Sequence, residues 1–224
     1  VLDELRSRAG DYLTKTVLDS LDKAGSKEKD VLLDPGDLRP TVVRRWRDML
    51  IRTKRDKSPL FVAWHRLDDV PETEFEKRAP AVIAELTKDG KLNGLLREGL
   101  TKQTPKSMLD VAKLYGDLFA RSNTEWKKAI DPKSRRPNEV GANEPSPTKL
   151  ADVALEEFRA VLFAGDAPTS LGMDLTHQVF DRKVRGQVDA LQKKVDSLTV
   201  TSPGAPPRAM SLVDNPQLYL SLIH

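Results

Sequence analysis

The sequence predicts an all-α fold, an irregular bundle of about six to seven amphipathic helices that ends in an extended, proline-rich C-terminal tail. Apolar residues recur at steps of three and four along most of the 224-residue chain, as on the buried face of a helix. No run alternates apolar and polar residues between turn signals, as a strand would. With 6 Phe, 3 Trp and 3 Tyr in the whole chain, we expect a core that relies on Leu, Val and Ala.

The first two helices are predicted over residues 1–24 and from about residue 38 onward. In the first, apolar side chains repeat from Leu2 to Leu21, and Gly25 with Ser26 should end it. The Asp-Pro-Gly-Asp run at residues 34–37 supplies turn and capping chemistry for the second helix. Its apolar face extends to Leu50 and includes Trp46.

The middle of the chain predicts three further helical stretches of unequal clarity. A short apolar piece at residues 60–67 precedes a helix at 71–86, which Pro80 should kink or split. Residues 91–99 have leucines at helical spacing but also glycines, which disfavour a helix. The clearest helix spans Met108 to Trp126, with Thr104 as its expected N-cap and Pro105 at its first position.

Two more helices are predicted after a polar, proline-bearing loop at residues 131–148. The first covers 150–163, with Gly165 as its stop signal. The second covers 175–198, where apolar residues from Phe180 to Leu198 form a heptad-like stripe that should pack against a neighbour. We therefore expect a helical domain at 1–198, with a subdivision near the 131–149 loop. Residues 199–224 should be an extended linker or the start of a following domain.

Composition and missing motifs exclude several classes of chemistry. The chain has no cysteine, which excludes disulfides, thiolate nucleophiles and covalent haem attachment through C-x-x-C-H within it. Nucleophile-elbow, zinc-protease, P-loop and dinucleotide-binding motifs are also missing. The apolar runs are far shorter than the ~18 residues of a membrane span, and the N-terminus has no signal-peptide pattern. We expect no membrane span, no metal site and no catalytic constellation in this stretch.

The remaining polar and aromatic candidates have simple structural interpretations. His65 and His177 are far apart in sequence and lack carboxylates at ligand spacing, so we expect structural or surface roles. Neighbouring residues of a helix diverge by about 100°, so the Asp68-Asp69 and Glu156-Glu157 pairs should cap helices or face solvent. The three tryptophans lie on apolar faces and should pack in the core. They are Trp46, Trp64 and Trp126.

Charge is unevenly distributed along the chain. Its formal net charge is only +3, yet residues 39–57 contain eight basic and two acidic side chains. Such a helix could bind nucleic-acid phosphates, a membrane surface or an acidic partner, although no nucleic-acid recognition motif accompanies it. The alternative is a solvated face that acidic helices nearby compensate. The candidate anion-binding residues are Arg44, Arg45, Arg47, Arg52, Lys54 and Arg55.

Several runs resemble one family of large proteins. They are AGDYL at 9–13, Trp46, PLFVAW at 59–64, SMLDVAKLYG at 107–116, LEEFRAVLF at 155–163, and PGAPPRAM at 203–210 with Leu212, Asp214 and Pro216. In these runs the chain resembles planctomycete secreted or cell-surface proteins with an N-terminal cytochrome c domain and two conserved domains of unknown function. The resemblance covers nearly the whole chain up to Pro216 and places it between those two domains.

This resemblance implies where the parent protein is located and which cofactor and domains it has, but it assigns no functional residue in this chain. Haem c is expected elsewhere in the parent protein, the flanking domains are expected partners, and the location should be periplasmic, at the cell surface or extracellular. No catalytic residue carries over. After Pro216 the chain departs from the family pattern, and residues 220–224 resemble the translated read-through of a sequencing adapter. Together with a start at Val1, this suggests a metagenomic fragment of a longer chain.

Three functions remain open at this point. The first is a non-catalytic helical spacer or docking module of a large exported cytochrome c-containing protein. The second is a module that binds an anionic polymer, such as an acidic polysaccharide or nucleic acid, through the basic helix at 39–57. The third makes this stretch part of the substrate cleft of a polysaccharide-degrading enzyme. The sequence leaves the oligomeric state open as well.

Overall fold

The computed structural model describes residues 2–21, 36–88, 90–131, 147–172 and 179–201. Within these ranges all regular secondary structure is helical, which confirms the predicted all-α class. Contacts divide the chain into two units, a helical body at Val1–Arg182 and a second unit at Lys183–His224. The proline-rich tail, most of the 131–148 loop and the Gly25-Ser26 stop lie outside the described residues.

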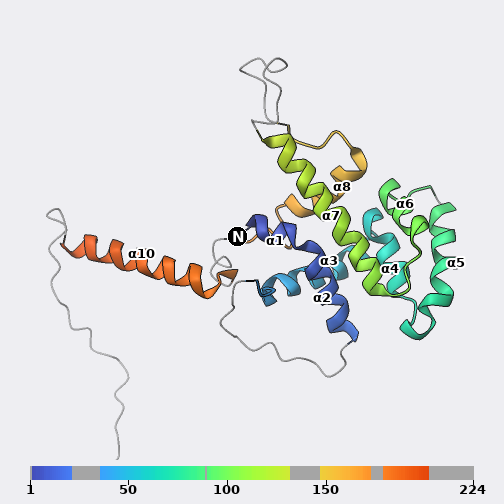
Figure 1. The fold of residues 1–224 in the computed structure, drawn as a ribbon, viewed down its shortest axis with the longest axis horizontal. Helices are drawn as coiled ribbons and strands as arrows, with labels where there is room; N and C mark the ends of the chain where they lie inside the picture. The colour runs from blue at the N-terminus through green and yellow to red at the C-terminus, as the bar shows by residue number, and fades with distance from the viewer. Residues whose placement is uncertain (1, 22–35, 89, 132–146, 173–178, 202–224) are drawn as a thin grey trace, which may run out of the picture. The chain divides into compact units, whose positions relative to one another are not determined.

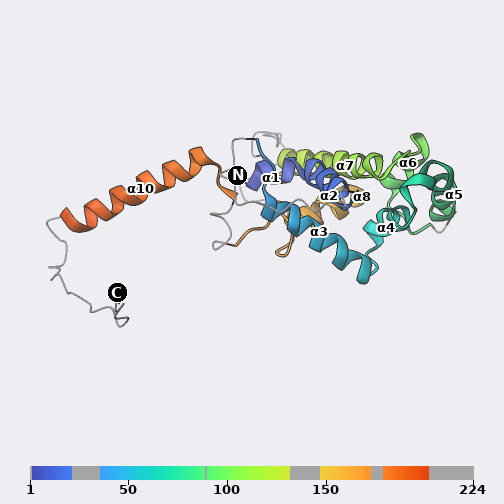
Figure 2. The same ribbon diagram turned by 90° about the horizontal axis from the view of Figure 1, so that it is seen from below.

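The body consists of short and medium-length helices arranged around one long helix (Figure 1). That long helix, α7 (Met108–Ile130), packs against α2 and α8, and in Figure 2 α7 and α3 lie on opposite sides of α2. The other elements are α1 (Leu2–Ser7), α2 (Ala9–Leu21), α3 (Pro40–Arg55), η1 (Pro59–Phe61), α4 (Val62–Asp68), η2 (Glu72–Glu74), α5 (Phe75–Lys88), α6 (Gly94–Lys102) and α8 (Val153–Phe163).

The core relies mainly on Leu, Val and Ala, as expected, and aromatic rings are concentrated at its centre. Tyr115 of α7 stacks on Phe61 with ring centroids 5.6 Å apart, and Trp64 meets Tyr115 edge-on at 5.4 Å. One turn further along α7, Phe119 packs edge-to-face with Trp46 and Phe158. Because few aromatics are available, the fold concentrates them at one place, where each ring buries a large apolar area. Leucines, valines and alanines surround this cluster.

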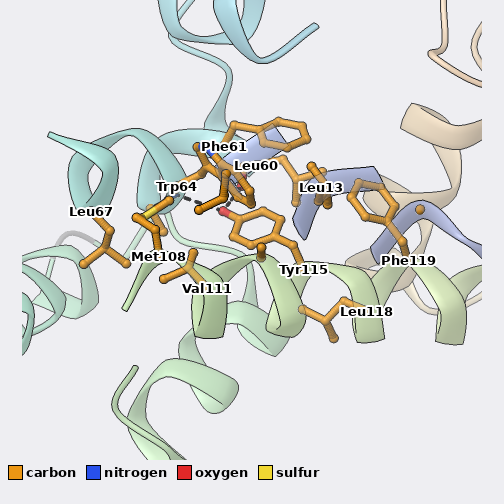
Figure 3. Packing of buried hydrophobic residues seen from close by; sticks show 14 of the residues in the cluster. Leu13, Leu60, Phe61, Trp64, Leu67, Met108, Val111, Tyr115, Leu118 and Phe119 are labelled. Carbon is orange, nitrogen blue, oxygen red and sulfur yellow. Dashed lines mark hydrogen bonds between the residues drawn. The ribbon is translucent and has the colours of Figure 1, made fainter. Parts of the chain in front are cut away.

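The Tyr115 hydroxyl secures this core to the backbone of η1 and α4. It donates a hydrogen bond to the Leu60 carbonyl at 2.8 Å and accepts one from the Trp64 amide at 3.3 Å (Figure 3). Burial raises the pKa of this phenol well above its ordinary value, so the hydroxyl keeps its proton. The only polar atom of a fully buried ring is thus satisfied on both sides.

Two glycines allow α2 and α7 to approach closely. A Cβ built on Gly116 would lie 2.4 Å from the Cα of Gly10, and one built on Gly10 would lie 3.0 Å from the Cα of Gly116. Both obstacles are backbone atoms, which cannot move aside as the end of a flexible side chain can. The crossing of the two helices therefore depends on glycine at both positions.

Two helices begin at other residues than predicted, because a proline and a capping box determine where they start. The second helix begins at Pro40 rather than near Leu38, because the residue before a proline is pushed out of the helical region, and Arg39 is extended. The long helix starts at Met108 without using Thr104 as its N-cap. Ser107 caps it instead, in a reciprocal capping box with Asp110.

Three other predictions need correction. The first helix is interrupted at Arg8, where α1 gives way to α2. Pro80 does not split its helix, because α5 continues from Phe75 to Lys88 with the proline on an exposed face, where water can reach the carbonyl it leaves unpaired. The last helix, α10 (Arg182–Thr201), excludes Phe180, since the preceding Val179 is held in the core of the body. Residues 175–178 lie outside the described residues.

Candidate functional site

The predicted anion-binding residues lie on α3, an amphipathic helix with one apolar and one basic face. Val42, Val43, Trp46 and Met49 are buried in the core. Pro40 at the first helical position fixes the start of the helix, since a missing N–H costs nothing there. The six candidate cations therefore project from the rest of the helix surface, and the structure determines how each one is used.

The side chain of Arg45 forms hydrogen bonds within the body instead of extending into solvent. Its Nη2 donates to the carbonyls of Ala167 and Ser170 at 2.8 Å each, and its Nε donates to the Pro168 carbonyl at 3.1 Å. A guanidinium carries five donors in a rigid fork, which suits it to several acceptors at once. Arg45 thus fastens the turn after α8 to α3, and a bound anion would have to compete with these three carbonyls.

Three other cations face acids from three different parts of the body. Arg47 pairs with Asp19 of α2 at 3.2 Å, Arg52 with Asp166 after α8 at 2.9 Å, and Lys54 with Asp69 at 2.6 Å. The hydrogen bond to Asp69 raises the pKa of Lys54. These acids are separated by many residues in sequence, so only the fold brings them to the basic face.

The last two candidates, Arg44 and Arg55, are exposed. Arg55 pairs with its neighbour Asp56, Nε to Oδ1 at 2.9 Å, and the same hydrogen bond lowers the pKa of the Asp56 carboxyl. All six candidates thus lie on one helix. Arg47, Arg52, Lys54 and Arg55 are paired with carboxylates and Arg45 with backbone carbonyls, so much of the local positive charge is compensated within the molecule.

His65 of α4 is buried beside α3. Its Nε2 lies 3.0 Å from the hydroxyl of Thr53, which itself donates to the Leu50 carbonyl. Because that hydroxyl uses its hydrogen on Leu50, the network assigns the Nε2–H tautomer to His65. Burial, and secondarily the charge of Lys54, lowers the pKa of this imidazole. His177 lies outside the described residues.

The adjacent carboxylates Glu156 and Glu157 point to different partners, as their spacing predicts. Glu156 forms a double salt bridge with Arg159, with both N···O distances 2.6 Å, and also accepts from the Leu150 amide. Glu157 instead accepts from the amide of Asn93, the residue that caps α6. The two neighbouring side chains therefore stabilise different elements.

A stack of cations and aromatic rings on α1, α7 and α8 was not expected from the sequence. The guanidinium of Arg159 lies 4.4 Å from the ring centre of Trp126, and that of Arg6 lies 4.2 Å from the ring centre of Phe163. Trp46 and Trp64 are buried as predicted, whereas Trp126 is only half-buried and forms part of this stack. The one signal in the sequence was the Glu156–Arg159 spacing, which places both residues on one helix face.

One hollow of about 420 Å³ lies between the end of α6 and the start of α7. Lysines and aspartates line it together with Gly99 and Leu114. Its Asp110 carboxylate is occupied by the amides of Lys106 and Ser107, and Lys102 pairs with Glu98. Polar and apolar surface line the hollow in about equal parts, whereas pockets that hold small organic ligands are mostly apolar.

The described ranges contain no cluster of three or more potential metal-ligating side chains, and none of their helices combines the length and hydropathy needed to cross a bilayer. No protein-family model, no curated protein and no solved structure matches the chain.

Proposed function

We propose that the helical body is a non-catalytic spacer or docking module of a longer exported, cytochrome c-containing protein. The observation that supports this best is how Arg45 is used. A residue of the most basic face is bonded to three carbonyls of the same chain, and its neighbours Arg47, Arg52 and Lys54 pair with acids from other elements. In this proposal, charge on α3 joins the elements of a rigid body, and the parent protein uses that body to separate or dock its other domains.

The proposal is tested on the purified chain with its native sequence. We expect cooperative unfolding of the body, followed by the fluorescence of its three tryptophans, and no retained haem after incubation with haemin and gel filtration. A Soret band that persists in the purified protein would overturn the proposal. So would a gradual, non-cooperative melt, because a spacer must hold a fixed shape.

Binding of an anionic polymer is the second candidate, and the exposure of three cations supports it. The side chains of Arg47, Lys54 and Arg55 are 46%, 50% and 75% exposed, and their partners are surface carboxylates. Surface ion pairs of this kind contribute only about 0–1 kcal/mol, so a polyanion could replace the carboxylates at little cost. Arg45 does not belong to this set, since removing it would disturb the fold.

Heparin chromatography separates the two candidates. The variant combines Arg47→Glu, Lys54→Glu and Arg55→Glu, and the matched control combines Lys102→Glu, Lys113→Glu and Lys128→Glu, which change the net charge equally at exposed sites on α6 and α7. Specific binding by α3 predicts that the first variant elutes at clearly lower salt than the control. Equal elution of the two variants would exclude the polymer-binding function.

A further inference from the structure

The helix α10 carries an apolar stripe that its own unit leaves exposed. Leu191, Val195 and Leu198 are 61%, 55% and 66% exposed, and none of the residues of α10 is buried. With Val188 these residues form one line along the helix, which we call the α10 seam. Exposed apolar side chains occur singly on many surfaces, but three exposed residues in register with the half-buried Val188 along one face indicate a missing partner.

The spacing of the α10 seam matches a coiled coil rather than a groove-binding helix. Its steps are three, four and three residues, so Val188 and Val195 occupy a positions of a heptad while Leu191 and Leu198 occupy d positions. Among parallel coiled coils, β-branched residues at a with leucine at d favour two strands over three or four. The residue types therefore favour a two-stranded form, whose direction the crosslinking experiment below tests.

The residues beside the seam are compatible with a second identical helix. In a parallel, in-register pair the g position of one helix faces the following e position of the other. These pairs would be Gln187 with Gln192 and Lys194 with Thr199, so no two like charges meet. The helix as a whole carries five basic and two acidic side chains, so binding to an anionic membrane surface is the alternative that the experiments must separate from dimerisation.

We propose that the α10 seam binds the α10 seam of a second copy of this chain, as a short parallel coiled coil. The helix has 20 residues, or about 30 Å at 1.5 Å per residue, but the seam at 188–198 covers only about one and a half heptads. The contact is smaller than the roughly 1,600 Å² of a standard stable interface. The dimer is therefore weak and concentration-dependent, and it would give the parent protein two copies of its other domains side by side.

Sedimentation velocity of the full chain, from low micromolar to near-millimolar concentration, tests this. The native chain is expected to shift from monomer to dimer over this range. Val195→Asp, which places a charge in the seam, should abolish the shift. Val200→Asp is the matched control, because Val200 is a similarly exposed valine (65%) of the same helix that lies off the seam. A native chain that stays monomeric throughout, or equal effects of the two variants, would overturn the proposal.

Cysteine crosslinking tests the direction, and the absence of native cysteine gives it a clean background. In a parallel pair Leu198 faces its own copy, so Leu198→Cys should form an interchain disulfide under mild oxidation, whereas Lys193→Cys on the outer face should not. A disulfide needs Cα atoms within about 7 Å, which an antiparallel pair would not provide at residue 198. Equal crosslinking of both variants would overturn the proposal. So would a chain that remains monomeric yet binds anionic phosphatidylserine vesicles through Val195.

Discussion

Gly10 and Gly116 are the residues at which the fold tolerates least change. A methyl group at residue 116 would lie 2.4 Å from a backbone atom of α2, so Gly116→Ala must push the two helices apart. We expect this variant to lose about 1–3 kcal/mol of unfolding free energy, the usual cost of overpacking a core. Urea denaturation followed by tryptophan fluorescence measures this loss.

Gly94→Ala is the control for that prediction. Gly94 begins α6, and nothing lies within 4 Å of a Cβ built there. This variant should be neutral or slightly more stable, because alanine restricts the unfolded chain more than glycine does. If both variants had the same stability, the close contact between α2 and α7 would be refuted.

His65 should make the stability of the body depend on pH. Its pKa in the folded state lies below the ordinary value of about 6.5, because burial disfavours the charged imidazole. The unfolded chain therefore takes up a proton first as the pH falls. The contribution of His65 to stability is complete above about pH 6.5 and is lost at lower pH. Urea unfolding at several pH values between neutral and mildly acidic should show this decline.

The variant His65→Gln isolates this effect, since the glutamine amide can still donate to Thr53 but does not titrate. We expect a smaller loss of unfolding free energy on acidification than in the native chain. Carboxylates titrate in both proteins, so the effect of His65 is the difference between the two plots of unfolding free energy against pH. Identical plots would mean that the pKa of His65 is the same in the folded and the unfolded chain, which would contradict the prediction.

At the scale of elements, Arg45 joins α3 to the turn at residues 167–170. Arg45→Met keeps much of the side-chain length but removes the donors to all three carbonyls, of which that of Ala167 keeps its bond from the Ser170 amide. We expect a loss of about 1.5–3 kcal/mol, the range for hydrogen bonds to a charged group, and faster hydrogen exchange of the Ser170 amide. Arg47→Met, which breaks only a surface ion pair, should cost at most about 1 kcal/mol.

The start of α7 gives a matched pair of threonine and serine variants. Ser107→Ala removes one half of the capping box and should cost about 1 kcal/mol, whereas Thr104→Ala should have little effect, since Thr104 lies before the helix. Thermal unfolding by circular dichroism compares them. A larger loss of thermal stability in Thr104→Ala than in Ser107→Ala would show that Thr104 is the N-cap, as the Thr-Pro pattern indicates.

The sequence predicted the helical class and the apolar faces well, because periodicity reports burial directly. The stripe from Met108 to Phe119 is indeed buried, as are Trp46 and Trp64. Periodicity does not report where a helix begins, since that depends on bonds such as those between Ser107 and Asp110. It also does not show that Gly10 and Gly116 meet, because that contact joins helices far apart in the chain.

The sequence predicted which basic residues the candidate site contains, but not which partners they have. The sequence places six cations on α3, and all six lie there. Which of them are available depends on Asp19, Asp69 and Asp166, whose positions only the tertiary fold determines. Arg45 is indistinguishable from Arg44 in the sequence, yet it is the residue that bonds to a distant turn.

At the scale of the whole molecule, two units with different stability should unfold separately. All three tryptophans lie in the body, in α3, α4 and α7, while α10 has no buried residue to stabilise it. Far-UV circular dichroism should therefore begin to fall at a lower temperature than tryptophan fluorescence changes. The early phase should shift to higher temperature as protein concentration rises, if α10 dimerises. Coincident curves at every concentration would contradict the two-unit description.

The packing of Phe158 against Phe119 also means that, during synthesis, one part of the aromatic core is made before the part that covers it. The Tyr115–Phe119 surface of α7 leaves the ribosome well before α8, which supplies the ring that covers it. At roughly 5–20 residues per second, the intervening 39 residues (119 to 158) take about 2–8 seconds to make. A nascent chain therefore lacks the α8 side of this aromatic cluster for seconds, and until α8 is made these rings are exposed to chaperones.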